Sequence, residues 1–552
     1  MKLEFFNLNP WASDLNQSRQ EIIKIQFIDR LFQRDFTLWK EKDEEISNRL
    51  GWLNSPLKIK PFLESYARQA EDFRASGIKL IVLLGMGGSS LAPEALSQLA
   101  GPRPGYPEFK VLDSTCPAMV KEVGRQTEKK PTLFIVSSKS GTTTETLSLF
   151  NYFYQQQVEI YGFEAGKNFV AITDPGTRLE KIATELNFRM IISGFPDVGG
   201  RFSALSPFGL FPAALIGYDL EKFLSPAIRS LSELQAGNYD HPGIKIGTTI
   251  GSLSHLSKNK LTLILPSSLK SLGRWLEQLI AESTGKEGKG IVPVIEIFPL
   301  DKDSYSPDRI FVYYDLEESK DFSYRSRIDH LLKLGQPLIH LTLSAEEIAE
   351  HLFVWEVATS VIGYFMKINP FNQPDVELTK IKTRELLAQS ATPVSSVVKL
   401  HLDNDKFFQE FKSFLLKRET PAEYLSLLAF LPPDEKLEIA LNNLARQITQ
   451  KTTLPCTWNY GPAYLHSTGQ LHKGGSDKGS FLGLISEEKE IVPIPDLPLS
   501  PSAAPSFNQL FISQALADFS ILKEKGRKVL AIKLEENLIE KIFSLGELVR
   551  NL

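Results

Sequence analysis

Hydroxyl side chains fill a short stretch between an apolar run and a helical pattern in the first third of the chain. Leu133–Val136 has the composition of a buried strand, and Glu145–Tyr154 has the apolar spacing of a helix. A helix N-terminus exposes free N–H groups and a partial positive charge, which together favour an anion. Ser and Thr are also common in simple capped turns, but their density here favours a phosphate site. The residues expected to bind the phosphate are Ser138, Lys139, Ser140, Thr142 and Thr143.

A glycine-rich turn follows an earlier apolar run, Leu80–Leu84, and precedes another predicted helix. The turn, Gly85–Ser90, stands where a dinucleotide-binding fold places its phosphate turn, but Ser90 occupies the third glycine position of that fingerprint. A dinucleotide site is therefore disfavoured. Because the carboxyl ends of parallel strands share one edge of a sheet, Gly88 and Ser89 are expected beside the hydroxyl loop and its ligand.

A third loop, Asp197–Ser203, places an arginine beside two glycines just after another predicted strand. The glycines allow a sharp bend, so the guanidinium of Arg201 can enter the same crevice as the other two loops. The alternative is structural: Arg201 pairs with Asp197 and fastens the turn. The shared sheet edge favours the site.

Glu282 lies on the buried stripe of a predicted helix. Trp275, Leu279 and Glu282 follow one another at helical spacing, which puts the carboxylate on the apolar face. A carboxylate in that position suits a general base that exchanges protons with carbon. An ion pair with Lys286, one turn later, is the competing interpretation, and the spacing does not choose between them.

Two prolines interrupt the helical pattern around residues 368–375, and Lys380 follows the break. Lys380 could reach a phosphate or a ring oxygen, although a lysine of this kind is usually only solvated. His466 and His472 lie in a glycine-rich segment that also carries hydroxyls, which makes them candidates for proton transfer. A lone histidine is more often structural, and most of the other histidines fit that description.

The order of apolar runs and helical patterns predicts an α/β protein with two tandem doubly wound, mostly parallel sheets flanked by helices. We expect a helical N-terminal cap and a mostly helical C-terminal region. The predicted domains are residues 1–70, 71–245, 246–395 and 396–552.

Composition excludes several classes of protein. The 552 residues carry a net charge of −4 without blocks of like charge, so nucleic acid and membrane are unlikely partners. No signal peptide or membrane span is recognisable, and a cytoplasmic location is expected. Cys116 and Cys456 lie far apart and lack neighbours at metal-ligand spacing, which indicates neither a disulfide nor a metal site.

Taken together, these segments resemble the phosphoglucose isomerase family. The sequence of residues 465–475 is most similar to the isomerase half of fused transaldolase/phosphoglucose isomerase proteins. Four separate motifs carry the resemblance, in family order between residues 70 and 390. They are Ser138–Thr146, Asp197–Gly209, Glu282–Lys286 and Asn369–Lys380.

The resemblance implies reversible interconversion of glucose 6-phosphate and fructose 6-phosphate through a cis-enediol, with no metal or cofactor. It implies that Glu282 moves the proton, that Arg201 stabilises the enediolate and that Gln373 lines the pocket. A histidine and Lys380 would handle the ring oxygen. The sequence Gly469–His472 is most similar to the family's histidine motif. His472 is therefore the predicted histidine for the ring oxygen, and His466 is the second choice.

The resemblance also implies a homodimer whose site is shared between subunits, so the histidine could come from the partner. Two other functions are compatible with the sequence: a dual phosphoglucose/phosphomannose isomerase, and a non-catalytic sugar-phosphate sensor. A sensor has no use for a buried Glu282 together with Arg201, which makes it the weaker alternative.

Overall fold

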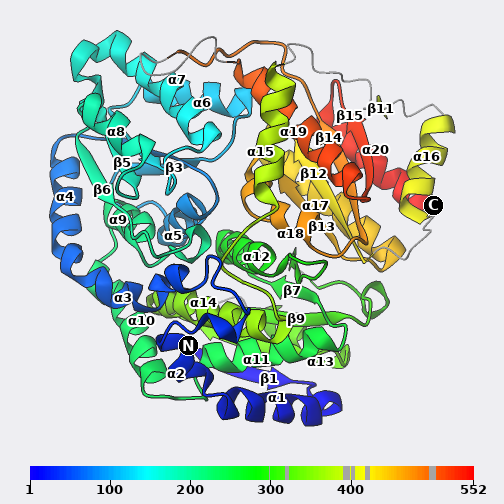
Figure 1. Cartoon of the computed structure of the whole chain (residues 1–552). Helices are drawn as coiled ribbons and strands as arrows, with labels where there is room; N and C mark the ends of the chain where they lie inside the picture. Colours follow the sequence, from blue (N-terminus) through cyan, green and yellow to red (C-terminus); the bar gives the residue numbers. More distant parts are fainter. Residues whose placement is uncertain (297–298, 318–322, 389–397, 400–404, 417–422, 497–504) are drawn as a thin grey trace.

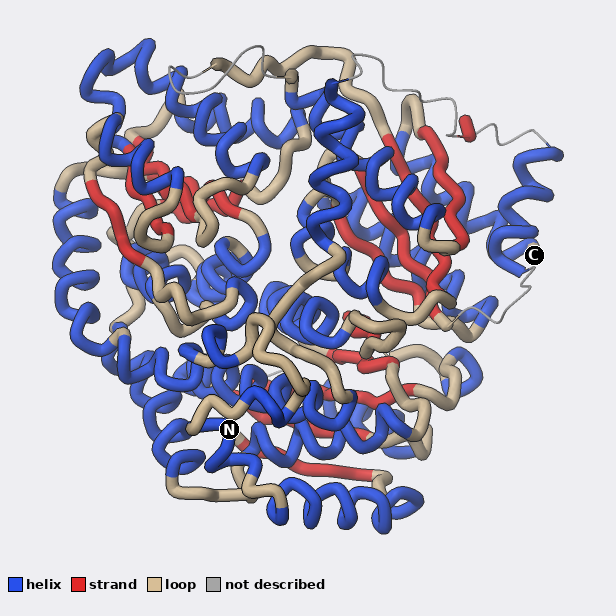
Figure 2. The backbone as a smooth tube through the Cα atoms, viewed as in Figure 1, coloured by secondary structure: helices blue, strands red, loops and turns tan. Residues whose placement is uncertain are grey.

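Three five-stranded sheets, each with helices packed around it, form the body of the protein (Figures 1 and 2). The computed structural model describes residues 1–296, 299–317, 323–388, 398–399, 405–416, 423–496 and 505–552. The predicted domain boundary at 395/396 lies outside these residues. Within the described residues, no helix is both long enough and apolar enough to cross a membrane.

The first sheet has the order β3-β2-β4-β5-β6 and is parallel throughout. Leu80 and Val82 face one apolar core, whereas Ile81 and Leu83 face another. A sheet buried on both faces explains the continuous apolar runs of its strands. Its elements are β2 (Leu80–Gly85), η6 (Gly87–Ser89), α5 (Leu91–Ala100), β3 (Glu108–Leu112), α6 (Pro117–Thr127), β4 (Thr132–Ser137), α7 (Thr144–Tyr161), β5 (Phe169–Thr173), α8 (Arg178–Glu185), β6 (Met190–Ser193), η8 (Gly200–Phe202) and α9 (Pro207–Ile216).

The second sheet has the order β1-β10-β9-β7-β8, and all of its pairs are parallel except β1 with β10. Helix α14 is buried along almost its whole length and packs against α10, α11 and α12. The elements are α10 (Leu220–Gln235), α11 (Pro242–His255), β7 (Lys260–Ile264), α12 (Lys270–Thr284), β8 (Val292–Glu296), β9 (Arg309–Leu316), α13 (Ser323–Lys333), β10 (Leu338–Leu343) and α14 (Ile348–Met366). The predicted pair of mostly parallel sheets is confirmed.

The expectation of a mostly helical C-terminal region missed a third sheet, of order β11-β15-β14-β12-β13 and parallel throughout. Helix α15 (Val376–Ala388) precedes this unit and packs against its helix α19. The other elements are β11 (Val398–Lys399), α16 (Asp405–Leu416), β12 (Tyr424–Phe430), α17 (Glu435–Thr452), β13 (Cys456–Tyr460), η13 (Ala463–His466), α18 (Gly469–Gly474), β14 (Gly479–Ile485), α19 (Phe507–Glu524), β15 (Lys528–Lys533) and α20 (Leu538–Asn551).

The N-terminal segment is helical as predicted except at its start. Residues Lys2–Phe6 form β1, which pairs antiparallel with β10 at the edge of the second sheet. Helices α1 (Ala12–Lys24), α2 (Phe27–Phe32), α3 (Ser55–Lys58) and α4 (Leu63–Ala75) follow. The segment is thus partly a component of the second unit rather than a separate cap.

Candidate active site

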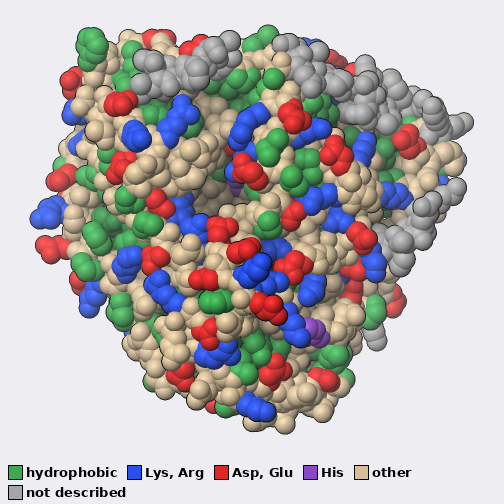
Figure 3. Space-filling model, in the orientation of Figure 1, with side chains coloured by type: hydrophobic (Ala, Val, Ile, Leu, Met, Phe, Trp, Pro, Cys, Tyr) green, Lys and Arg blue, Asp and Glu red, His purple; other side chains and the backbone are tan. Residues whose placement is uncertain are grey.

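Two loops of the first sheet flank the point at which its strand order reverses. Strand β2 has β3 on one side and β4 on the other, and ligands of open parallel sheets bind at such a point. The loops after β2 and β4 meet there, because Ser137 Oγ donates a hydrogen bond to Ser89 O (3.2 Å). The space-filling view is hollowed beside this region, between the first unit and α15 (Figure 3).

The glycine turn after β2 packs directly against the arginine loop. A Cβ on Gly88 would lie 2.0 Å from Gly200 O, so a side chain is sterically excluded there. Ser203 Oγ also donates to Gly88 O (3.3 Å). The predicted convergence of these two loops is therefore present in the structure.

The hydroxyl loop after β4 leaves the start of α7 open. Thr143 is the N-cap of this helix, but its side chain makes no capping hydrogen bond. Its Oγ1 instead lies 3.1 Å from Ser138 Oγ, while Ser140 Oγ accepts a bond from Thr142 N (3.3 Å). A simple capped turn would have its first N–H groups satisfied by Thr143. The open geometry favours an anion site instead.

Lys139 has a different role from the neighbouring hydroxyls. Its Nζ pairs with Asp174 and donates to Phe195 O (3.1 Å), and burial lowers the pKa of its ammonium group despite that carboxylate. The side chain thus fastens the loop to the strand ends beyond it. The prediction that Lys139 contacts the ligand is not supported by this arrangement.

Arg201 joins the first unit to the second. Its Nε donates to Ser283 Oγ (2.7 Å) and its Nη2 to Pro370 O (2.7 Å), and the guanidinium is almost completely buried. Asp197 pairs instead with Lys58 (2.9 Å) and Arg34 (3.1 Å). The alternative that Arg201 pairs with Asp197 is therefore wrong.

The carboxylate of Glu282 is held on both oxygens. Arg201 Nη1 lies 3.5 Å from Oε1, and Gln278 Nε2 donates to Oε2 (3.0 Å). Glu282 is 8% exposed, as expected for the buried face of α12. Lys286 turns away and donates to Asn369 O and to Asn372 Oδ1 (3.1 Å), so it does not form the alternative pair.

The segment between α14 and α15 brings Gln373 to Arg201. Arg201 Nη1 donates to Gln373 Oε1 (2.9 Å), and Nη2 donates to Asn372 O (2.9 Å). The two prolines that interrupt the helical pattern thus let the backbone wrap around the guanidinium. Lys380, on the exposed side of α15, pairs with Glu377 (3.0 Å).

His466 lies between the first and second units. Its Nε2 lies 3.0 Å from Glu145 Oε1, and its carbonyl accepts a bond from Gln278 Nε2 (2.8 Å). Burial raises the pKa of Glu145, but His466 and, more weakly, Lys380 outweigh it and hold that pKa below its usual range. Contacts therefore run without a break from the start of α7, through Glu145, His466 and Gln278, to Glu282.

A model of the phosphoglucose isomerase family matches residues 57–289. A glucose-6-phosphate isomerase of Rubrobacter xylanophilus is 30% identical over 398 residues, which are 61% of this chain and 91% of that protein. One from Leptospira interrogans is 29% identical over 60% of this chain and 85% of its own length.

The chain belongs to the phosphoglucose isomerase family. Two solved structures share the fold: a hypothetical protein of Thermus thermophilus (TM-score 0.58, 24% identity, 70% of this chain and all of that one) and a glucose-6-phosphate isomerase of Chlamydia trachomatis (TM-score 0.57, 18% identity, 69% and 87%).

The family model ends before the third sheet, from which His466 comes. The groups described above nevertheless meet within one chain. The expectation that a partner subunit supplies the histidine stays a prediction.

His472 occupies a different environment from His466. Its ring is 1% exposed on α18, and its centroid lies 4.9 Å from that of Phe481 and 5.8 Å from that of Tyr464. Burial, with the charges of Lys473 and Arg527, holds its pKa well below the usual range. The first choice for the ring-opening histidine thus lies in an aromatic core, and the second choice faces the site.

The sequence analysis assigned no role to Glu145, Gln278 or Gln514. Gln514 Nε2 donates to the same Glu145 oxygen as His466 (2.6 Å). Gln278 could have been found from its spacing, because it precedes Glu282 by one helical turn. Glu145 and Gln514 meet across 369 residues, and no local pattern reveals that contact.

Proposed function

We propose that this protein interconverts glucose 6-phosphate and fructose 6-phosphate. The observation that carries the proposal is the carboxylate of Glu282, which Arg201 and Gln278 hold. Contacts through His466 and Glu145 link it to the open start of α7. A phosphate at α7 would position the other end of an open-chain sugar near a fixed base and a fixed cation.

In the proposed reaction, Glu282 takes the proton from carbon 2 of the aldose and returns it to carbon 1. The electron pair of the broken C–H bond forms the double bond of an enediolate. As carbon 1 is protonated, the hydroxyl proton of carbon 2 moves to the oxygen of carbon 1 and a carbonyl forms at carbon 2. Before that transfer, the negative charge of the enediolate lies on the former carbonyl oxygen. Arg201 would stabilise that charge. Gln278 would orient the carboxylate, because its amide donates to the oxygen that Arg201 does not face.

The phosphate would be bound by the hydroxyl loop and the free N–H groups of α7. We assign this role to Ser138, Ser140, Thr142 and Thr143, with the Gly88–Ser89 turn closing one side. Ser140 and Thr142 are exposed, and Ser138 is buried beneath them.

Replacing both Ser140 and Thr142 by Ala is expected to raise KM for fructose 6-phosphate more than it lowers kcat, because the phosphate binds in the ground state and transition state alike. Each lost charge-assisted bond contributes about 1.5–3 kcal/mol, so KM rises at least tenfold. Steady-state kinetics measure both constants. Ser76→Ala, which also removes a hydroxyl from a turn, is the control and should change neither; a double variant with unaltered KM contradicts the assignment.

We propose that His466, not His472, opens the sugar ring. Glu145 and Gln514 form a fixed support behind its imidazole, and Lys380 acts on the same carboxylate from the site's edge. Proton transfer to the ring oxygen requires an accessible imidazole, which His472 lacks.

His466→Ala is expected to lower kcat by about 10²-fold or more. Its effect on proton transfer at carbon should be smaller when the ring of the sugar phosphate is already open. His472→Phe, which keeps an aromatic ring in the core, is the paired variant and should retain activity. Rates with ring-forming hexose phosphate and with an open-chain analogue separate the two steps. Equal losses in both variants would reject the assignment.

A coupled assay of fructose 6-phosphate conversion on the purified chain tests the proposed function. Formation of glucose 6-phosphate supports it, and binding without turnover would indicate the sugar-phosphate sensor. Mannose 6-phosphate in the same assay distinguishes a dual isomerase. We also propose the family's homodimer and a cytoplasmic location; light scattering and cell fractionation test these two properties.

A further inference from the structure

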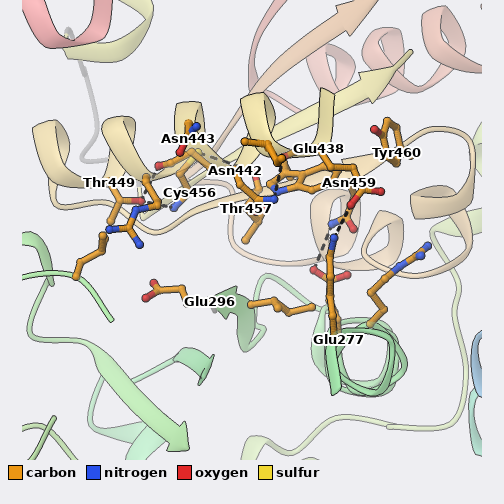
Figure 4. A pocket seen from close by; sticks show the side chains of 18 residues that line it. Glu277, Glu296, Glu438, Asn442, Asn443, Thr449, Cys456, Thr457, Asn459 and Tyr460 are labelled. Atoms are coloured by element: carbon orange, nitrogen blue, oxygen red, sulfur yellow. Dashed lines mark hydrogen bonds and ion pairs between the residues drawn. The ribbon is translucent and has the colours of Figure 1, made fainter. Parts of the chain in front are cut away.

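A cavity lies between the second and third units, beside helix α12, which carries Glu282. Figure 4 shows it bounded by α17 and β13 on one side and by α12 and β8 on the other. Its volume is about 540 Å³, within the range of small-molecule sites, roughly 300–1,000 Å³. Glu277 faces this cavity, whereas its neighbour Gln278 faces Glu282. The cavity thus uses a different part of α12 from the site described above, and a small pocket lined by Gly87, Glu277 and Asn459 lies between the two.

The basic groups of the cavity are already matched by carboxylates. Lys270 Nζ lies 2.6 Å from Glu438, and Arg274 Nη1 lies 3.0 Å from Glu94. Arg446 acts electrostatically on Glu296. A phosphate or carboxylate ligand would have to displace one of these partners, so the cavity does not favour an anion.

The remaining polar groups are amides, hydroxyls and the carboxyl group of Glu277. Asn459 Nδ2 donates to Glu277 Oε1 (3.2 Å), and this pair projects into the cavity in Figure 4. Burial raises the pKa of Glu277 to about 7, so near neutral pH its carboxyl group both donates and accepts. Asn443, on α17, adds a further amide to the lining, and Tyr460 contributes a hydroxyl that interacts with the backbone at Asp434.

Aromatic rings supply the apolar part of the wall. Trp458 and Tyr460 lie edge to face, with centroids 5.3 Å apart. The indole is fixed in place because its Nε1 donates to Asn442 Oδ1 (2.9 Å). A rigid aromatic face beside amide groups suits a ring that has both C–H and hydroxyl surfaces.

We propose that the cavity between α12 and α17 binds a neutral, hydroxyl-rich ring compound, that is, an unphosphorylated mono- or disaccharide. The ligand class follows from the paired charges, the amides and the indole face. This site would allow the protein to bind a free sugar and a sugar phosphate at the same time, on different faces of α12.

Saturation-transfer NMR with D-glucose and maltose tests this proposal. The full-length protein is first saturated with an equilibrium mixture of glucose 6-phosphate and fructose 6-phosphate, which occupies the catalytic site. We expect signals from at least one neutral sugar to persist. If the hexose phosphates abolish those signals, the sugar binds at the catalytic site and the cavity proposal is overturned, while the isomerase function stands.

Two substitutions locate the bound sugar. Trp458→Ala is expected to weaken binding about tenfold, and Asn443→Leu to weaken it without removing any buried ring. Phe163→Ala, which removes a fully exposed ring elsewhere, is the control for stacking on surface aromatics. Isomerase activity confirms that each variant is folded. Unaltered binding in both cavity variants would overturn the proposal.

Discussion

Replacing Glu282 by Gln is expected to lower kcat for fructose 6-phosphate by about 10²–10⁴-fold, the usual contribution of a general base. The substitution keeps the size of the side chain but removes the group that accepts the proton. KM should change little, because the phosphate is bound by a different part of the site. Steady-state kinetics with a coupled assay measure both constants.

Glu356→Gln is the matched control for that variant. Glu356, on α14, is fully buried, and burial raises its pKa well above the usual range, which favours the neutral carboxyl group that Gln imitates. We expect unaltered kcat. A Glu282→Gln enzyme that retained most of its activity would exclude Glu282 as the base.

Arg201→Ala is expected to lower kcat by about 10²–10³-fold, as does the loss of one donor to a developing oxyanion. Arg201 also donates to Pro370 O and Ser283 Oγ, so some of the loss comes from movement of the segment around it. Added guanidinium separates the two effects, because it restores the charge without restoring the covalent link. We expect partial recovery of kcat.

Arg34→Ala is the control for Arg201. Arg34 pairs with Asp197, which belongs to the same loop as Arg201, but the Arg34 side chain is exposed. Its loss should leave kcat unaltered. A comparable loss in both arginine variants would show that loop stability, rather than charge on the enediolate, explains the result.

Most strands could be predicted from sequence because the sheets are buried on both faces. Parallel strands of this kind are continuous apolar runs, such as Leu80–Leu84 and Leu133–Val136, and they are short enough to exclude a helix. The third sheet was missed for a related reason. Tyr424–Phe430 is also apolar, but it lies between long helical patterns, where periodicity alone does not distinguish a strand from a helix.

Site groups were predictable where local geometry fixes their direction. Helical spacing placed Glu282 on the buried face of α12, and loop position brought the loop of Arg201 against the Gly88 turn. His466 and His472 lie six positions apart with similar neighbours in sequence, and only the turn from η13 into α18 sends one to the site and the other into an aromatic core. Contacts across hundreds of residues, such as Glu145 with His466, follow from the packing of whole units.

In the proposed mechanism, Glu282 moves a proton between two carbons of a bound sugar phosphate. The most direct measurement is deuterium incorporation from D₂O into carbon 1 and carbon 2 of hexose phosphate, followed by NMR for the native protein and for Glu282→Gln at saturating substrate. The proposed mechanism predicts incorporation by the native protein and almost none by the variant, although the variant still binds substrate. Undiminished incorporation by the variant would contradict it.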